Sequence, residues 1–146
     1  MISRRALLCA LFAAACINED LEVYEVTLSG TVSIGGVIAE PGEVHLELHH
    51  ARTGAGKFET PLGYIDATIE PELGPTEWTT YVLLGRGEGL VLYGWLDRDG
   101  DGVLCAPGSF PEPAGAVELS GFPDHTIDFS LTLDTDCAGS AALYPP

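Results

Sequence analysis

From Tyr24 onwards, apolar and polar residues alternate along the chain with a period of two. This period is typical of β-strands that turn one face toward a core and the other toward water. Segments with this pattern, together with one apolar run, make about seven predicted strands. They are Tyr24–Ile34, Glu43–His50, Leu62–Glu70, Trp78–Leu84, the apolar run Leu90–Leu96, Val117–Leu119 and Ile127–Leu133. Glycine and proline fall between most of these segments, as turns require.

These patterns predict an all-β protein, a single antiparallel β-sandwich of about seven strands, immunoglobulin-like or transthyretin-like in outline. A small barrel is the alternative. The segment Leu90–Leu96 is apolar at both parities, so we expect a central strand or one whose outer face is covered by a loop. Its Tyr93 and Trp95, together with Trp78, have two interpretations. They pack in the core, or they form an exposed face that stacks on sugar rings or binds a partner chain.

The N-terminal segment 1–15 has the pattern of an export signal. Arg4 and Arg5 precede an apolar run, Ala6–Ala15, that is too short to span a bilayer. Small residues then lead directly into Cys16. This arrangement resembles the lipobox of bacterial lipoprotein precursors. The resemblance implies cleavage before Cys16 and diacylation of that cysteine, while ordinary signal-peptide cleavage and secretion are the alternative.

The predicted domain organisation follows from this start. We expect a signal peptide over 1–15, a lipidated cysteine and tether over 16–22, the β-sandwich over 23–137 and a flexible tail over 138–146. The predicted location is the cell envelope, where the lipid anchor on Cys16 binds a membrane.

Acidic residues strongly outnumber basic ones, with 22 Asp and Glu against 6 Lys and Arg and a formal net charge of -16. Such a surface repels phosphate backbones, which excludes nucleic acid as a partner. Cations are the natural counter-charge. The chain also lacks the motifs of a catalytic serine, a zinc-protease helix and a phosphate-binding loop, so we expect no enzyme.

Two cysteines, Cys105 and Cys137, remain in the predicted domain. Export places them in an oxidising compartment, so we expect a disulfide between them. Free or metal-binding thiols are the weaker alternative, because a tetrahedral thiolate site needs further ligands that are not nearby in the sequence.

The strand Leu90–Leu96 ends in an Asp/Gly loop with aspartates at alternate positions, Asp97, Asp99 and Asp101. Carboxylates at this spacing converge in a tight loop, and calcium takes 6–8 oxygen ligands at about 2.3–2.6 Å. The loop is not an EF-hand, because Gly108 stands where a bidentate glutamate belongs. We therefore expect calcium in a loop between strands, with a solvated turn as the alternative.

The predicted disulfide extends this hypothesis. Asp134 and Asp136 directly precede Cys137, so bonding of Cys105 to Cys137 carries them toward the Asp/Gly loop. They are candidates for the remaining calcium ligands. Without a cation, five gathered carboxylates repel one another.

Histidines on the second predicted strand are a weaker metal candidate. His45, Glu47 and His49 share one face of Glu43–His50, but the two histidines are about 13 Å apart in an extended strand. One zinc ion cannot bind both, so we expect a plain polar face, with a two-ligand contact completed by a residue elsewhere in the chain as the alternative.

Two short motifs, Ser29–Val32 and Gly89–Gly102, resemble bacterial extracytoplasmic domains of the transthyretin-like or carboxypeptidase-regulatory-like type. Those domains have an opening Gly-x-Val strand and a late strand that runs into an Asp/Gly turn. The resemblance implies an accessory role without catalysis. The predicted function is therefore a lipid-anchored, calcium-braced extracytoplasmic β-sandwich that acts as a binding or structural module toward a protein or glycan partner. A carbohydrate-binding module that uses the aromatic face is the alternative.

Overall fold

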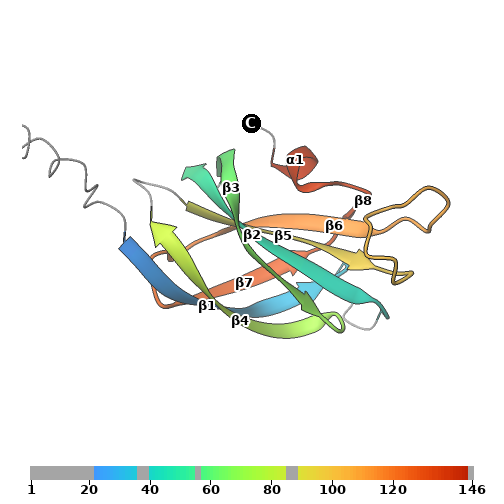
Figure 1. Cartoon of the computed structure of the whole chain (residues 1–146), viewed down its shortest axis with the longest axis horizontal. Helices are drawn as coiled ribbons and strands as arrows, with labels where there is room; N and C mark the ends of the chain where they lie inside the picture. Colours follow the sequence, from blue (N-terminus) through green and yellow to red (C-terminus); the bar gives the residue numbers. More distant parts are fainter. Residues whose placement is uncertain (1–21, 36–39, 55–56, 85–88, 145–146) are drawn as a thin grey trace, which may run out of the picture.

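The computed structural model describes residues 22–35, 40–54, 57–84 and 89–144. Its elements, in chain order, are β1 (Glu22–Ser33), β2 (Glu43–Gly54), β3 (Lys57–Glu70), β4 (Gly74–Leu84), β5 (Gly89–Asp97), β6 (Pro113–Leu119), β7 (Thr126–Thr132), β8 (Thr135–Asp136) and α1 (Ser140–Leu143). Figure 1 shows two layers of strands, with α1 on the far side of one layer.

The two layers are a three-stranded sheet in the order β4-β1-β7 and a five-stranded sheet in the order β3-β2-β5-β6-β8. They pack face to face, which confirms the predicted β-sandwich. Every neighbouring pair is antiparallel except β1 and β7, which run parallel with Thr27 opposite Thr126. After β6 the chain crosses from the five-stranded sheet to the three-stranded sheet. There β7 lies beside β1 and runs in the same direction as β1.

Each predicted strand is present, but several boundaries differ. The sequence pattern predicted this strand only over Val117–Leu119, whereas β6 begins at Pro113. A proline at the first position of a strand is tolerated, because its missing N–H need not join the ladder.

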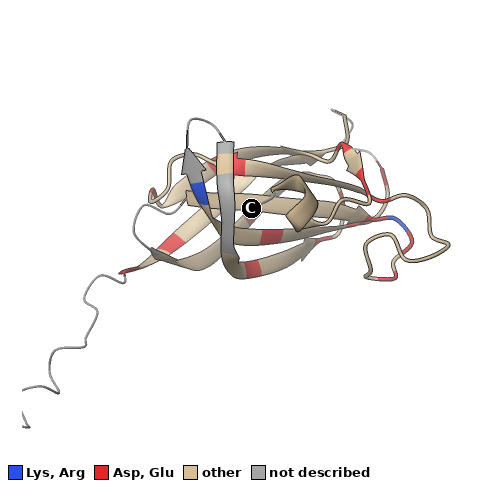
Figure 2. Cartoon of the chain, turned by 90° about the horizontal axis from the view of Figure 1, so that it is seen from above, with Lys and Arg blue, Asp and Glu red and all other residues tan. Residues whose placement is uncertain are grey.

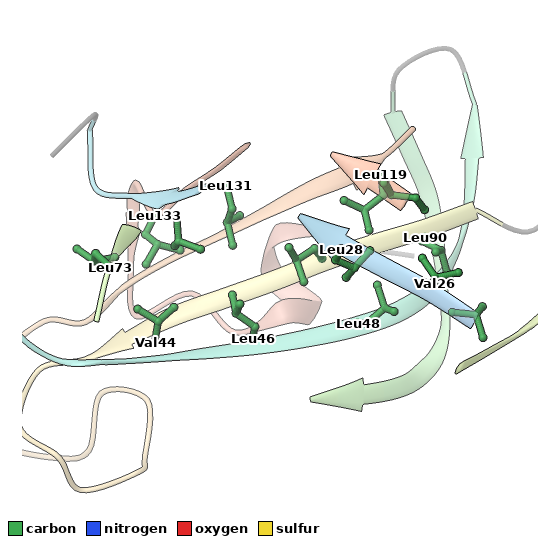
Figure 3. Close-up of a cluster of buried hydrophobic side chains, with 14 of the residues drawn as sticks. Val26, Leu28, Val44, Leu46, Leu48, Leu73, Leu90, Leu119, Leu131 and Leu133 are labelled. Carbon is green, nitrogen blue, oxygen red and sulfur yellow. The ribbon is translucent and has the colours of Figure 1, made fainter. Parts of the chain in front are cut away.

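The main core lies between the two sheets (Figure 3). It consists of Val26, Leu28, Val32, Val44, Leu46, Leu48, Leu73, Val82, Leu90, Leu92, Leu96, Leu119, Ile127, Leu131 and Leu133. The alternating parity seen in the sequence supplies most of these side chains. At Gly94 a β-carbon would lie only 2.7 Å from Cδ2 of Leu46 and 2.9 Å from Cδ2 of Leu131, so glycine here allows the sheets to approach.

A second cluster covers the opposite face of the five-stranded sheet. It contains Ala51, Val91, Tyr93, Trp95, Ala114, Ala138 and Tyr144. All nine residues of β5 are buried, since both of its faces are covered. This agrees with the expectation from its two apolar parities.

The C-terminal segment provides the cover. We expected a flexible tail from residue 138, but α1 forms there, and Ala138 and Tyr144 are buried against the sheet. The hydroxyl of Tyr93 donates a hydrogen bond to the carbonyl oxygen of Ala138 at 3.0 Å. The sequence pattern did not predict this contact, because the small residues of this segment show no apolar–polar periodicity.

Candidate metal centre

Asp97 is the last residue of β5, and only 2% of it is exposed. Its Oδ1 accepts a hydrogen bond from the N–H of Gly100 at 2.7 Å, and its Oδ2 accepts one from the N–H of Gly102 at 2.8 Å. Both glycines adopt positive φ, 74° and 71°, a region open to glycine without strain. The loop therefore turns around the carboxylate of Asp97.

The charge state of Asp97 reflects two opposing effects. Burial favours the neutral acid, but the N–H groups of Gly102 and Gly100 and the nearby imidazole of His45 outweigh it and hold the pKa of Asp97 below its ordinary value. The carboxylate therefore stays ionised at neutral pH, as a cation ligand must be.

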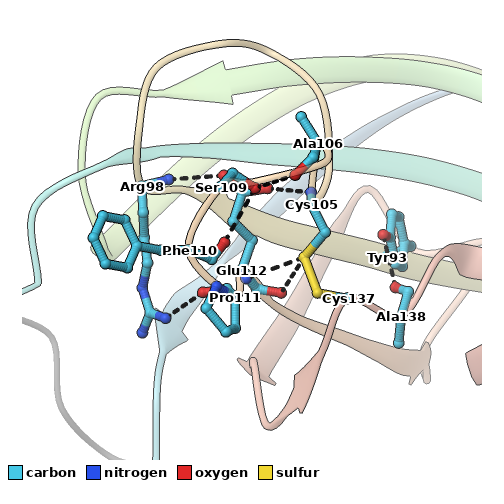
Figure 4. The surroundings of a disulfide bond; sticks show 10 residues. All are labelled: Tyr93, Arg98, Cys105, Ala106, Ser109, Phe110, Pro111, Glu112, Cys137 and Ala138. Atoms are coloured by element: carbon cyan, nitrogen blue, oxygen red, sulfur yellow. Dashed lines mark hydrogen bonds between the residues drawn. A yellow bond between two sulfur atoms is a disulfide. The ribbon is translucent and has the colours of Figure 1, made fainter.

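Glu112 is a second buried carboxylate, with no exposed surface. Its Oε1 accepts a hydrogen bond from the backbone N–H of Arg98 at 3.1 Å, and its Oε2 accepts one from the N–H of Cys105 at 2.5 Å. One side chain thus holds both ends of the Asp/Gly loop (Figure 4). Sequence reasoning missed Glu112, because a single acid between two prolines belongs to no periodic pattern.

The predicted disulfide is present between Cys105 and Cys137, whose Cα atoms are 5.5 Å apart. It joins the Asp/Gly loop to the end of β8. The N–H of Cys137 also donates to the carbonyl oxygen of Glu112 at 2.8 Å. The loop, Glu112 and the C-terminal segment are therefore one connected unit.

Three carboxylates come together here. Asp97, Asp99 and Glu112 each offer an oxygen, and these oxygens all lie within 4.8 Å of one another. Such a group could hold a cation. Two of the five predicted ligands, Asp97 and Asp99, are in it, and Glu112 is the third member.

The other three predicted ligands belong to no such group among the described residues. Asp101 is exposed, and its Oδ1 accepts the N–H of Val103 at 2.7 Å. Asp134 and Asp136 are exposed as well. The disulfide brings the backbone of β8 to the loop, but β8 pairs with the edge of β6 and leaves these side chains in water.

Arg98 is the cation within the loop. Its Nε donates to Oε1 of Glu40 at 2.6 Å, and a terminal guanidinium nitrogen donates to the carbonyl oxygen of Pro111. Glu40 therefore balances the charge of this guanidinium. The side chain ties the loop to the segment that precedes β2.

The aromatic residues do not form the exposed face that the carbohydrate alternative needs. Tyr93 and Trp95 are 3% and 6% exposed, in the cluster beneath the C-terminal segment. Trp78 lies on the other sheet and packs against the main core. Both faces of β5 are covered, so Tyr93 and Trp95 are core residues, whereas Trp78 is half-buried on β4.

The predicted signal peptide and Cys16 lie outside the described residues. In the part of the chain that the structure describes, no helix has the length and apolar composition needed to cross a membrane.

Comparison with known proteins adds no family. No protein-family model matches the chain, and no curated protein is significantly similar to it. Function must therefore be argued from the geometry of the site and from the sequence patterns.

Proposed function

We propose that this protein is a lipid-anchored extracytoplasmic β-sandwich whose Asp/Gly loop binds calcium, and that it acts as a binding or structural accessory module. The observation that carries the proposal is the convergence of Asp97, Asp99 and Glu112, two of them buried, beside the disulfide. The lipid anchor rests on the sequence alone, with Cys16 as the acylated residue.

The carboxylates retain capacity for a cation. A carboxylate has about four acceptor positions, and one backbone N–H occupies each oxygen of Asp97 and Glu112. The remaining lone pairs suit a hard divalent ion, which prefers oxygen ligands. Water and backbone carbonyl groups would complete the shell, since three carboxylates supply only part of the 6–8 ligands that calcium takes.

Charge supports the same proposal. Acidic residues are spread over the strands and recur in the loop at one end of the molecule (Figure 2), and the whole chain carries a formal net charge of -16. This field concentrates cations at the surface. Calcium bound between the loop and the start of β6 would brace the end of the sandwich, which is a structural role and requires no catalytic group.

The test is thermal unfolding of the chain, expressed from its full sequence and purified with the disulfide formed, in calcium and in chelator. An ion that binds only the folded state raises the melting temperature by mass action, by roughly 5–10 °C at 100 times the dissociation constant. Asp99→Asn removes one exposed ligand and should abolish most of this shift. The matched control Asp128→Asn changes an exposed acid on β7 and should retain it.

Identical melting curves across millimolar calcium would leave the loop as a solvated turn held by hydrogen bonds. The lipid anchor is tested separately by labelling cells with a radioactive fatty acid. The unmodified chain should incorporate the label and pellet with membranes, while Cys16→Ser should do neither. Label on the Cys16→Ser variant would contradict the assignment.

A further inference from the structure

A second group of candidate metal ligands lies on the outer face of the five-stranded sheet. Glu43 and His45 are two residues apart on β2, so they share one face. On β5, Asp97 is directly opposite Glu43, and Trp95 is directly opposite His45. Adjacent strands thus place an imidazole and two carboxylates around one point.

The distances match that placement. Nε2 of His45 lies 3.7 Å from Oδ2 of Asp97. One ligand atom from each of Glu43, His45 and Asp97 lies within 4.8 Å of the others. A strand face therefore provides three ligands without help from any flexible loop.

The imidazole of His45 is directed toward this point, where its Nε2 lies near the carboxylate of Asp97. Nε2 of His45 is buried and has no hydrogen-bond partner among the described residues. The ring stacks on the indole of Trp95, with centroids 4.2 Å apart and planes inclined by 17°. Stacking holds the ring in its orientation, and an unsatisfied buried nitrogen costs free energy unless a proton donor or a metal ion meets it.

We propose that Glu43, His45 and Asp97 form a site for a borderline divalent transition metal ion such as zinc. Zinc binds histidine nitrogen at about 2.0–2.1 Å and carboxylate oxygen at about 2.0–2.2 Å, which sets tetrahedral ligand atoms about 3.4 Å apart. The 3.7 Å between His45 and Asp97 closes to that value with a small movement. Glu43 is exposed and can rotate to complete the set, and water takes the fourth position.

This site goes beyond the proposed calcium function and differs from it in chemistry. Imidazole nitrogen suits zinc, copper and nickel, whereas calcium prefers oxygen throughout. The two groups share only Asp97. His45 therefore belongs to the zinc site alone, and Asp99 belongs to the calcium site alone, which makes the two separable.

The experiment is calorimetric titration of zinc chloride into the full chain, with the disulfide formed and bound metal removed by chelation. The unmodified chain should bind one zinc ion per chain at this site. His45→Gln should weaken binding by at least about tenfold, since even residues that only orient metal ligands contribute that much. Asp99→Asn should leave zinc affinity unchanged and lose the calcium response.

His49→Gln is the matched control. His49 lies on the same strand face and is half-buried, but its Nε2 is already 2.9 Å from Oε2 of Glu47. Zinc affinity should survive this substitution. Failure of the unmodified chain to bind zinc, equal affinity in His45→Gln, or equal loss in Asp99→Asn would each overturn the proposal.

Nuclear magnetic resonance of the histidine rings in the unmodified chain keeps the proposal testable where His45→Gln does not fold. The chain has four histidines. Zinc should shift the ring nitrogens of His45 first and most strongly. A leading shift at His49, His50 or His125 would place zinc elsewhere and contradict the site.

Discussion

The carboxylate of Glu112 accepts the backbone N–H of Cys105 at 2.5 Å, across a loop whose other end it also holds through the N–H of Arg98. A single buried side chain therefore closes the Asp/Gly loop. The geometry of the loop therefore depends on Glu112, a residue that the sequence pattern does not single out.

Glu112→Ala should lower the free energy of unfolding by about 2–4 kcal/mol, because two partly buried N–H groups lose their acceptor and the buried Glu112 side chain leaves a cavity. Glu112→Gln keeps one acceptor oxygen and should cost less. Urea unfolding measures both. Glu72→Ala, at an exposed acid in the turn before β4, is the control, and equal stability of Glu112→Ala and Glu72→Ala would contradict the role assigned to Glu112.

The disulfide should contribute measurably to stability, because it joins residues separated by 32 positions. Replacing both Cys105 and Cys137 by Ser should lower the free energy of unfolding by about 3–4 kcal/mol on the chain-entropy estimate. Hydrogen exchange should also increase in β8 and α1, which the bond holds to the loop. Unchanged exchange there would show that apolar packing alone fixes the C-terminal segment.

Period-two alternation was enough to predict the sandwich, because inward positions such as Leu46 and Leu131 alternate regularly with polar ones. The same reasoning placed β5 at the centre from its two apolar parities. It failed where packing has no period. The cover formed by Ala138 and Tyr144 depends on single contacts, and a start of β6 at Pro113 depends on the register with its neighbours.

The group of three carboxylates was predicted only in part, because the sequence pattern captures local spacing and misses tertiary contacts. Asp97 and Asp99 stand in one short loop, where local spacing determines convergence. Glu112 reaches the same point through tertiary folding, and no sequence spacing encodes that approach. Asp134 was expected at the Asp/Gly loop because the disulfide was expected to join its segment to the loop. The disulfide brings the two backbones together, but the strand pairing decides the direction of the side chains.

The C-terminal cover can be tested by substitution at Tyr144, which is 2% exposed and contacts His49 and Phe58 through its ring. Tyr144→Ala should lower the free energy of unfolding by about 3–5 kcal/mol, the usual cost of emptying an aromatic site in a core. Tyr81→Ala removes the same group from an exposed position on β4 and should cost far less. Similar losses in the two variants, measured by urea unfolding, would mean that the segment is not packed.

The stability of the folded chain should depend on pH in the acid range, because the ionised carboxylate of Asp97 accepts the hydrogen bonds of the loop. Its folded-state pKa is lowered from the ordinary 3.8 by the hydrogen bonds from Gly102 and Gly100 and by His45, against the effect of burial. A carboxyl group with a lowered pKa contributes stability that is fully present above its unfolded-state pKa and is lost as pH falls through the folded-state value. The stability difference between the unmodified chain and Asp97→Asn should therefore be fully present at about pH 5 and should shrink as the pH falls further. Urea unfolding at a series of pH values measures it, with Asp128→Asn as the control for an exposed acid. A difference that persists undiminished to pH 2.5 would show that the ionised form of Asp97 does not hold the loop.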